Sequence, residues 1–151
     1  MLIDCSNTTA NTTGEIRFIN HASFDLAYIE RGNYIHVQWK GSQTLSTIQD
    51  GCKQLCDLLI ESGADKVLND GRRAVGCWAT SVPWIVYCFL PQARRAGMRV
   101  AAHVLAKERK SRMSAHAFQL FADFCEWNLA FFQTIDEAED WLVSGRHILA
   151  T

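Results

Sequence analysis

Polar and apolar residues alternate in the stretch FDLAYIERGNYIHVQWKG, residues 24–41, on both sides of a turn that contains a glycine. The apolar positions of this pattern are Leu26, Tyr28, Ile35, Val37 and Trp39. A period of two residues is typical of a β-strand that buries one face. The two strands and the turn at residues 31–33 together predict a β-hairpin.

A helical period replaces this alternation in residues 44–62, where apolar side chains recur every three or four positions. Thr44 is a suitable N-cap for the helix, and Gly63 is a suitable C-terminal stop. The short apolar segment KVLND, residues 66–70, then predicts a strand that ends at Gly71.

Helices and strands continue to alternate along the rest of the chain. Residues 81–97 predict a helix bent at Pro91, and MRVAAHVLA, residues 98–106, predicts a strand covered on both faces. The next helix, whose phenylalanines we expect to fill the core, carries on one side Met113, Ala117, Leu120, Phe121 and Phe124. The segments NLAFFQT and TIDEAEDWL predict a last strand and helix, the latter with the capping-box spacing of Thr134 and Glu137.

A hairpin followed by alternating helices and strands favours right-handed crossovers and a mostly parallel sheet. We therefore predict a single α/β domain with a sheet of about five strands, an N-terminal antiparallel hairpin and about four helices. Residues 1–14, rich in Thr and Asn, predict a flexible arm. Residues 15–145 would form the domain, and residues 146–151 a C-terminal tail.

Charge and composition argue against several classes of protein. The 15 basic and 16 acidic residues give no excess of positive charge, so we expect no nucleic-acid partner. No apolar run approaches the roughly 20 residues that span a bilayer, and the start of the chain lacks the basic residues of a signal peptide. We therefore expect a cytoplasmic protein with reduced cysteines. The cysteines and histidines lack the spacing of metal ligands, so no metal is predicted.

The stretch KVLNDGRRAVGCW, residues 66–78, concentrates the candidate chemistry. Asp70 has no second carboxylate, serine or histidine in the same motif, and no sequence pattern supplies a histidine partner for Cys77. The chain also lacks the glycine-rich phosphate loops of nucleotide-binding proteins. We therefore predict no catalytic residue, no cofactor and no enzyme activity.

Five segments, YIHVQWKG, KVLND, WIVYCFLP, ARRAGMRVAAHVL and FFQTIDEAEDWL, together resemble one protein family. The family is the SpoIIAA-like or STAS family, named for sulfate transporters and anti-sigma-factor antagonists, and the resemblance is closest to small bacterial proteins of this fold. It covers roughly residues 24–143. It implies a SpoIIAA-like (STAS) domain with a regulatory or interaction role, because the shared motifs concern packing and turns.

The anti-sigma-factor antagonists of that family carry Asp-Ser in the loop after the central strand, and a kinase phosphorylates a serine at the start of the next helix. The matching region here reads Asn69-Asp70-Gly71-Arg72-Arg73, which keeps the acid and lacks the hydroxyl. The nearest hydroxyl groups belong to Thr80 and Ser81. A phosphorylation-controlled antagonist is therefore a second alternative function rather than the leading one.

Polar residues follow two predicted strands at their carboxyl ends, where ligands of parallel sheets bind. These residues are Asn69, Asp70, Arg72 and Arg73 in one group, and Lys107, Arg109, Lys110 and Arg112 in the other. If the groups are neighbours, they form a basic rim that suits an anionic small molecule or an acidic partner. The alternative is a solvated turn that Asp70 caps.

Two tryptophans are further candidate contacts, since Trp78 lies in a predicted loop and Trp84 lies off the main stripe of its helix. Trp78 can also serve only to cover the end of the sheet. We expect a non-catalytic module that binds a protein partner or itself, with Trp84 and Tyr87 buried in a homodimer. The alternative is a carrier or sensor of an anionic or lipid-like small molecule, similar to SEC14 or CRAL-TRIO domains, with a pocket along residues 117–127.

Overall fold

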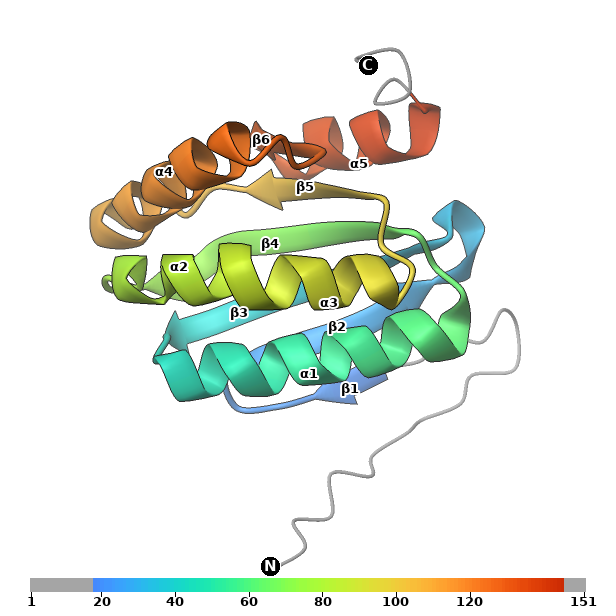
Figure 1. Ribbon diagram of the computed structural model, residues 1–151, viewed down its shortest axis with the longest axis horizontal. Helices are drawn as coiled ribbons and strands as arrows, with labels where there is room; N and C mark the ends of the chain where they lie inside the picture. Colours follow the sequence, from blue (N-terminus) through green and yellow to red (C-terminus); the bar gives the residue numbers. More distant parts are fainter. Residues whose placement is uncertain (1–17, 146–151) are drawn as a thin grey trace, which may run out of the picture.

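One mixed sheet of six strands forms the centre of the fold, which a computed structural model describes for residues 18–145 (Figure 1). The strands lie in chain order across the sheet: β1 (Phe18–Asn20), β2 (Phe24–Ile29), β3 (Tyr34–Ser42), β4 (Lys66–Val75), β5 (Val100–Val104) and β6 (Leu129–Phe132). The arm expected over residues 1–14 and the tail over residues 146–151 lie outside the described residues.

The first three strands pair antiparallel, and β3 to β6 pair parallel. The prediction of an α/β fold that begins with an antiparallel hairpin is therefore confirmed. The predicted number of strands is one too small, because β1 has only three residues and cannot show an alternating pattern.

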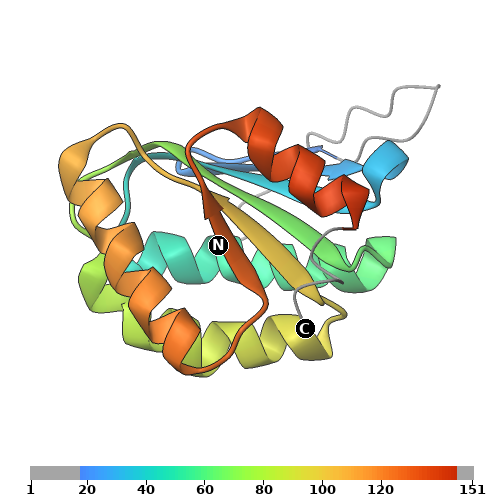
Figure 2. The same cartoon turned by 90° about the horizontal axis from the view of Figure 1, so that it is seen from above.

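Three helical segments cover one face of the sheet, and one helix lies on the other (Figure 2). The first face carries α1 (Leu45–Ser62), the segment from α2 (Val82–Trp84) to α3 (Leu90–Arg95), and α4 (Arg109–Phe124). The second face carries α5 (Ile135–Ser144), which packs on β4, β5 and β6. The larger hydrophobic core lies beneath the three segments, and a smaller one lies beneath α5.

Local sequence signals define the ends of α1 as predicted. Oγ1 of Thr44 accepts a hydrogen bond from the backbone N–H of Thr47, and Oγ1 of Thr47 accepts one from the N–H of Thr44. Gly63 ends the helix with a φ of 71°, in the left-handed region that glycine adopts at little cost.

The second helix continues through Pro91 by means of a π-helical turn, Ile85–Phe89. Proline has no N–H to donate to the carbonyl of the residue four positions earlier, which is Tyr87. In the wider turn, the N–H of Leu90 donates to the carbonyl of Ile85. The helix is therefore widened locally and ends at Arg95.

Helix α4 packs on the fold through a different side from the predicted one. Its buried side chains include Phe118, Ser111 and Ser114. The two serines are stable there because Trp78 donates to both, from its indole N–H to Ser111 and from its backbone N–H to Ser114. The predicted core stripe instead lies toward solvent, with its large members all exposed: Met113, Leu120, Phe121 and Phe124.

Strand β4 does not end at Gly71, as predicted, but continues to Val75. The residues expected in a loop, Asn69 to Arg73, therefore lie within the sheet. Gly71 has no positive φ, and it serves a close contact between strands instead. A Cβ at this position would lie 2.8 Å from the carbonyl oxygen of Val104 and 3.3 Å from Nε2 of His103.

A β-bulge follows Asp70 in β4. Gln38 pairs with Asp70 and Lys40 pairs with Arg73, so β4 has one more residue than β3 between the two pairs. An extra residue locally breaks the alternation of side chains between the faces. As a result, Gly71 and Ala74 both face the space between the sheet and the three helical segments.

We predict that Gly71→Ala lowers the free energy of unfolding by about 1–3 kcal/mol, because the added methyl group meets a backbone oxygen of the neighbouring strand. Chemical denaturation of the variant and the wild type measures the difference. A variant as stable as the wild type would show that β4 and β5 do not approach each other this closely.

Candidate functional site

Two adjacent polar residues of β4, Asn69 and Asp70, direct their side chains to opposite faces of the sheet, as the two-residue period of a strand requires. Asn69 lines a cavity in the larger core. Asp70 contacts polar side chains of β3 and β4 on the other face. Each residue is the centre of a separate hydrogen-bonded group.

The carboxylate of Asp70 is completely buried and accepts several hydrogen bonds. Arg72 donates Nε to Oδ1 and Nη2 to Oδ2, both at 2.9 Å, and its backbone N–H donates to Oδ1 at 3.1 Å. Gln38 donates to Oδ2 at 3.3 Å, and Nε2 of His36 lies 3.0 Å from the same oxygen. Such a two-pronged contact between arginine and carboxylate fixes the geometry of both side chains.

These contacts keep Asp70 ionised. Burial raises the pKa of its carboxyl group, but the hydrogen bonds from His36 and Arg72, together with the charge of Arg72, outweigh burial and hold the pKa well below its usual range. A general base must accept a proton near neutral pH and needs an accessible lone pair. The geometry of Asp70 therefore supports a structural role.

Asn69 links two side chains of neighbouring strands on the opposite face. The indole Nε1 of Trp39 donates to Oδ1 of Asn69 at 2.6 Å, and Nδ2 of Asn69 lies 2.6 Å from Nδ1 of His103. An indole N–H can only donate, so the amide oxygen of Asn69 must face Trp39 and its NH₂ group must face His103. Nδ1 of His103 is therefore the acceptor, and a neutral His103 carries its proton on Nε2.

His103 is 6% exposed and lies in a predominantly aromatic and apolar environment. Its ring centroid is 5.2 Å from that of Phe131, 6.1 Å from that of Phe118 and 6.3 Å from that of Trp78. Burial lowers the pKa of His103 to about 4. The side chain is therefore a neutral imidazole at physiological pH.

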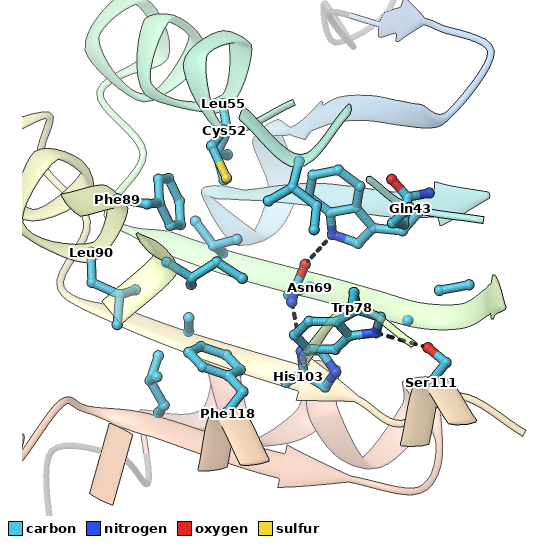
Figure 3. Close-up of a pocket in the computed structure, with 18 of the residues that line it drawn as sticks. Gln43, Cys52, Leu55, Asn69, Trp78, Phe89, Leu90, His103, Ser111 and Phe118 are labelled. Atoms are coloured by element: carbon cyan, nitrogen blue, oxygen red, sulfur yellow. Dashed lines mark hydrogen bonds between the residues drawn. The ribbon is translucent and has the colours of Figure 1, made fainter. Parts of the chain in front are cut away.

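A cavity of about 80 Å³ adjoins this group, between the sheet and the three helical segments (Figure 3). Its lining is mainly apolar, with contributions from Cys52, Leu55, Phe89, Leu90 and Phe118. A drug-sized or lipid-like ligand needs a site of about 300 Å³ or more. The lipid-like cargo considered above would therefore need a larger pocket than this cavity, and Phe121 and Phe124 are exposed and do not line it.

A hydrogen bond that involves an acidic residue joins the two segments that carry the predicted basic groups. Oε2 of Glu108, in the segment after β5, accepts the backbone N–H of Gly76, in the segment after β4, at 3.1 Å. Arg72 is engaged with Asp70, whereas Arg73, Lys107 and Arg109 are exposed. The structure thus places a carboxylate between the two segments, which weakens the case for an anion site there.

Trp78 is half-buried in the segment after β4 and lines the cavity. Its indole Nε1 donates to Oγ of Ser111 at 3.0 Å, and its ring packs edge-on against Phe118 (Figure 3). Trp84 is half-buried and stacks on Phe89, with ring centroids 6.4 Å apart. Neither tryptophan projects freely from the surface.

The hydroxyl groups considered for phosphorylation lie in the 3-10 turn Ala79–Ser81. Thr80 is exposed, and Ser81 is 3% exposed, so a kinase would reach only Thr80 without local unfolding. Cys77 is exposed nearby, and hydrogen bonds from the backbone of Ala79 and from Ser114 lower the pKa of its thiol.

Sequence reasoning missed the two histidines of these groups. His103 interrupts the apolar strand MRVAAHVLA, and a polar residue in a strand covered on both faces requires a partner. His36 occupies a polar position of the alternating hairpin strand. The sequence thus contained a signal for both residues, but it did not identify Asn69 and Asp70 as their partners.

No protein-family model matches the chain, and no curated protein matches it. Within residues 18–145, no helix is both long and apolar enough to cross a membrane.

We predict that Asp70→Asn lowers the free energy of unfolding by about 2–3 kcal/mol at neutral pH, because Arg72 loses its charged partner. The folded pKa of Asp70 lies below the unfolded value, so its contribution is present above about pH 4 and is lost as the pH falls further. The difference between wild type and variant should therefore shrink in acid. Urea denaturation at neutral pH and in acid measures it.

The exposed Asp57→Asn variant is the matched control and should change stability by no more than about 0.5 kcal/mol. An Asp70→Asn protein as stable as the wild type, or a difference independent of pH, would contradict a stabilising ion pair between buried Asp70 and Arg72.

Proposed function

We propose that the protein is a non-catalytic interaction module that associates with a second copy of itself through the outer side of α4. The observation that carries the proposal is the exposure of large apolar side chains there: Phe124 is 86% exposed, Leu120 73% and Met113 59%. Clustered exposed apolar residues of this size are typical of protein interaction sites. The outer surface of α4 is defined here by Met113, Ala117, Leu120, Phe121 and Phe124.

This surface extends onto the neighbouring helical segment. Tyr87, 60% exposed, packs edge-on against Phe121 with ring centroids 6.5 Å apart. Aromatic residues and methionine are enriched in the cores of protein interfaces. Tyr87 would therefore contribute to the homodimer interface, as the sequence analysis expects. Half-buried Trp84 and buried Asp70 would not be part of that interface.

The charges on α4 favour an antiparallel arrangement of two copies. Arg109, Lys110 and Arg112 are exposed at the start of the helix, and Asp123 is exposed near its end. Arg112 and Asp123 are about three helical turns apart, so they lie along the same flank of the outer surface. A twofold axis between the two copies, level with the middle of the helix, would bring Arg112 of each copy near Asp123 of the other.

The same arrangement places apolar residues opposite one another. With the helices antiparallel, Met113 would face Phe124 and Ala117 would face Leu120 of the second copy, in the manner of side chains packed between helices. The positive charges near the helix N-terminus would also gain an acidic partner, whereas the helix dipole of one copy alone disfavours them. The resemblance to STAS proteins is consistent with a module of this kind.

A charge exchange on α4 tests the proposal. The wild type should sediment as a dimer at micromolar concentration, and Arg112→Glu or Asp123→Lys alone should weaken the dimer about five- to tenfold, as expected for loss of a pair at an interface. The double variant should recover the affinity. If Arg112 and Asp123 instead contacted other residues, the double variant would not recover the affinity, and this result would contradict the proposed pairing.

Leu120→Lys should abolish the dimer, and Ile60→Lys is the matched control, because Ile60 is an exposed apolar residue of α1 with 69% exposure. A monomeric wild type at high micromolar concentration, or equal effects of the two lysine substitutions, would refute self-association through α4.

A further inference from the structure

The cavity beside Asn69 contains a hydrogen-bond donor that the protein itself does not use. His103 lines the cavity, and the bond from Asn69 to its Nδ1 leaves the proton of the neutral ring on Nε2. Among residues 18–145, Nε2 of His103 has no hydrogen-bond partner. Nε2 of His103 is not among the fully enclosed side-chain atoms of the described residues that lack a hydrogen-bond partner, so it keeps some open space beside it, where an acceptor atom can lie.

The backbone of β4 leaves room in front of this donor. Gly71 lacks the Cβ that would lie 3.3 Å from Nε2 of His103. The β-bulge also brings Ala74, rather than a larger side chain, to the cavity wall. Two small residues of one strand therefore keep the space next to the imidazole open.

Most other polar side chains around the cavity already have partners. Trp39 and Asn69 are bonded to each other, and the indole N–H of Trp78 is bonded to Ser111 (Figure 3). A buried water molecule needs about two to four polar partners. An organic molecule with one acceptor atom needs only the imidazole N–H and apolar surroundings, which this cavity offers.

The lining also limits the charge and size of an occupant. No aspartate, glutamate, lysine or arginine is among the residues of the described chain that line the cavity, and a buried charge without a partner is strongly disfavoured. The volume of about 80 Å³ is smaller than the roughly 150 Å³ of an engineered cavity that holds benzene. Met98 lies in the wall, and its flexible side chain can adjust to a slightly larger guest.

We propose that this cavity binds a small uncharged organic molecule whose single acceptor atom receives the Nε2–H of His103 and whose remaining atoms contact apolar side chains. The molecule has the size of a short ketone, because the cavity is smaller than one that holds an aromatic ring. His103 and Asn69 determine the ligand chemistry, because Asn69 fixes the tautomer that donates. The site is separate from the outer surface of α4 and does not depend on self-association.

Acetone and isobutene form a matched pair of small probes for this site, because they share one shape and only acetone has an acceptor oxygen. Acetone is uncharged and should bind the wild-type protein at millimolar concentration, about five- to tenfold more tightly than isobutene. Titrations followed by NMR should move the backbone amide signals of Gly71, Ala101 and His103. The imidazole Nε2 signal should shift with acetone and not with isobutene.

Ala101→Leu should remove acetone binding, because Ala101 lines the cavity and the larger side chain would fill it. Ala22→Leu, at an exposed position, is the control and should bind like the wild type. If Ala101→Leu does not fold, the shifts of the wild-type amide signals still locate the probe.

Three outcomes would overturn the proposal. They are an affinity for acetone that does not exceed the affinity for isobutene, perturbed signals that lie outside the cavity, and no binding of either probe at millimolar concentration. Any one of them would show that the unpaired imidazole N–H does not select a ligand.

Discussion

The structure depends on the need to satisfy two adjacent buried polar side chains in the central strand β4. Asn69 and Asp70 face opposite sides of the sheet, and each would be costly to bury without partners. Arg72, His36 and Gln38 meet the carboxylate on one side, while Trp39 and His103 meet the amide on the other. The hydrogen bonds tie β3, β4 and β5 together in one register.

This constraint extends from the sheet to the cavity. The donor-only indole of Trp39 sets the orientation of the Asn69 amide, and that orientation sets the tautomer of His103. The close contact at Gly71 and the bulge that follows Asp70 leave space beside the imidazole. The imidazole of His103 therefore lines the cavity, and its Nε2 is the atom that we propose binds the acceptor of a ligand.

The sequence correctly predicted the features of the fold that depend on short-range interactions. Thr44 and Gly63 define α1 through contacts within one turn, and the hairpin follows from a two-residue period. Asn69-Asp70-Gly71 has the composition of a turn, but partners from β3 and β5 keep it extended, and no local pattern reveals those partners. The buried side of α4 was also unpredictable, since Ser111 and Ser114 become suitable for burial only when Trp78, far away in the sequence, bonds to them.

The protonation of His103 tests the central claim most directly. Two-dimensional NMR spectra that correlate the imidazole nitrogens with the ring protons distinguish the two neutral tautomers and the charged form. From about pH 5.5 to about pH 8, His103 should remain neutral with its proton on Nε2, because burial lowers its pKa to about 4. A proton on Nδ1, or a titration near neutral pH, would contradict the bond from Asn69 and with it the donor in the cavity.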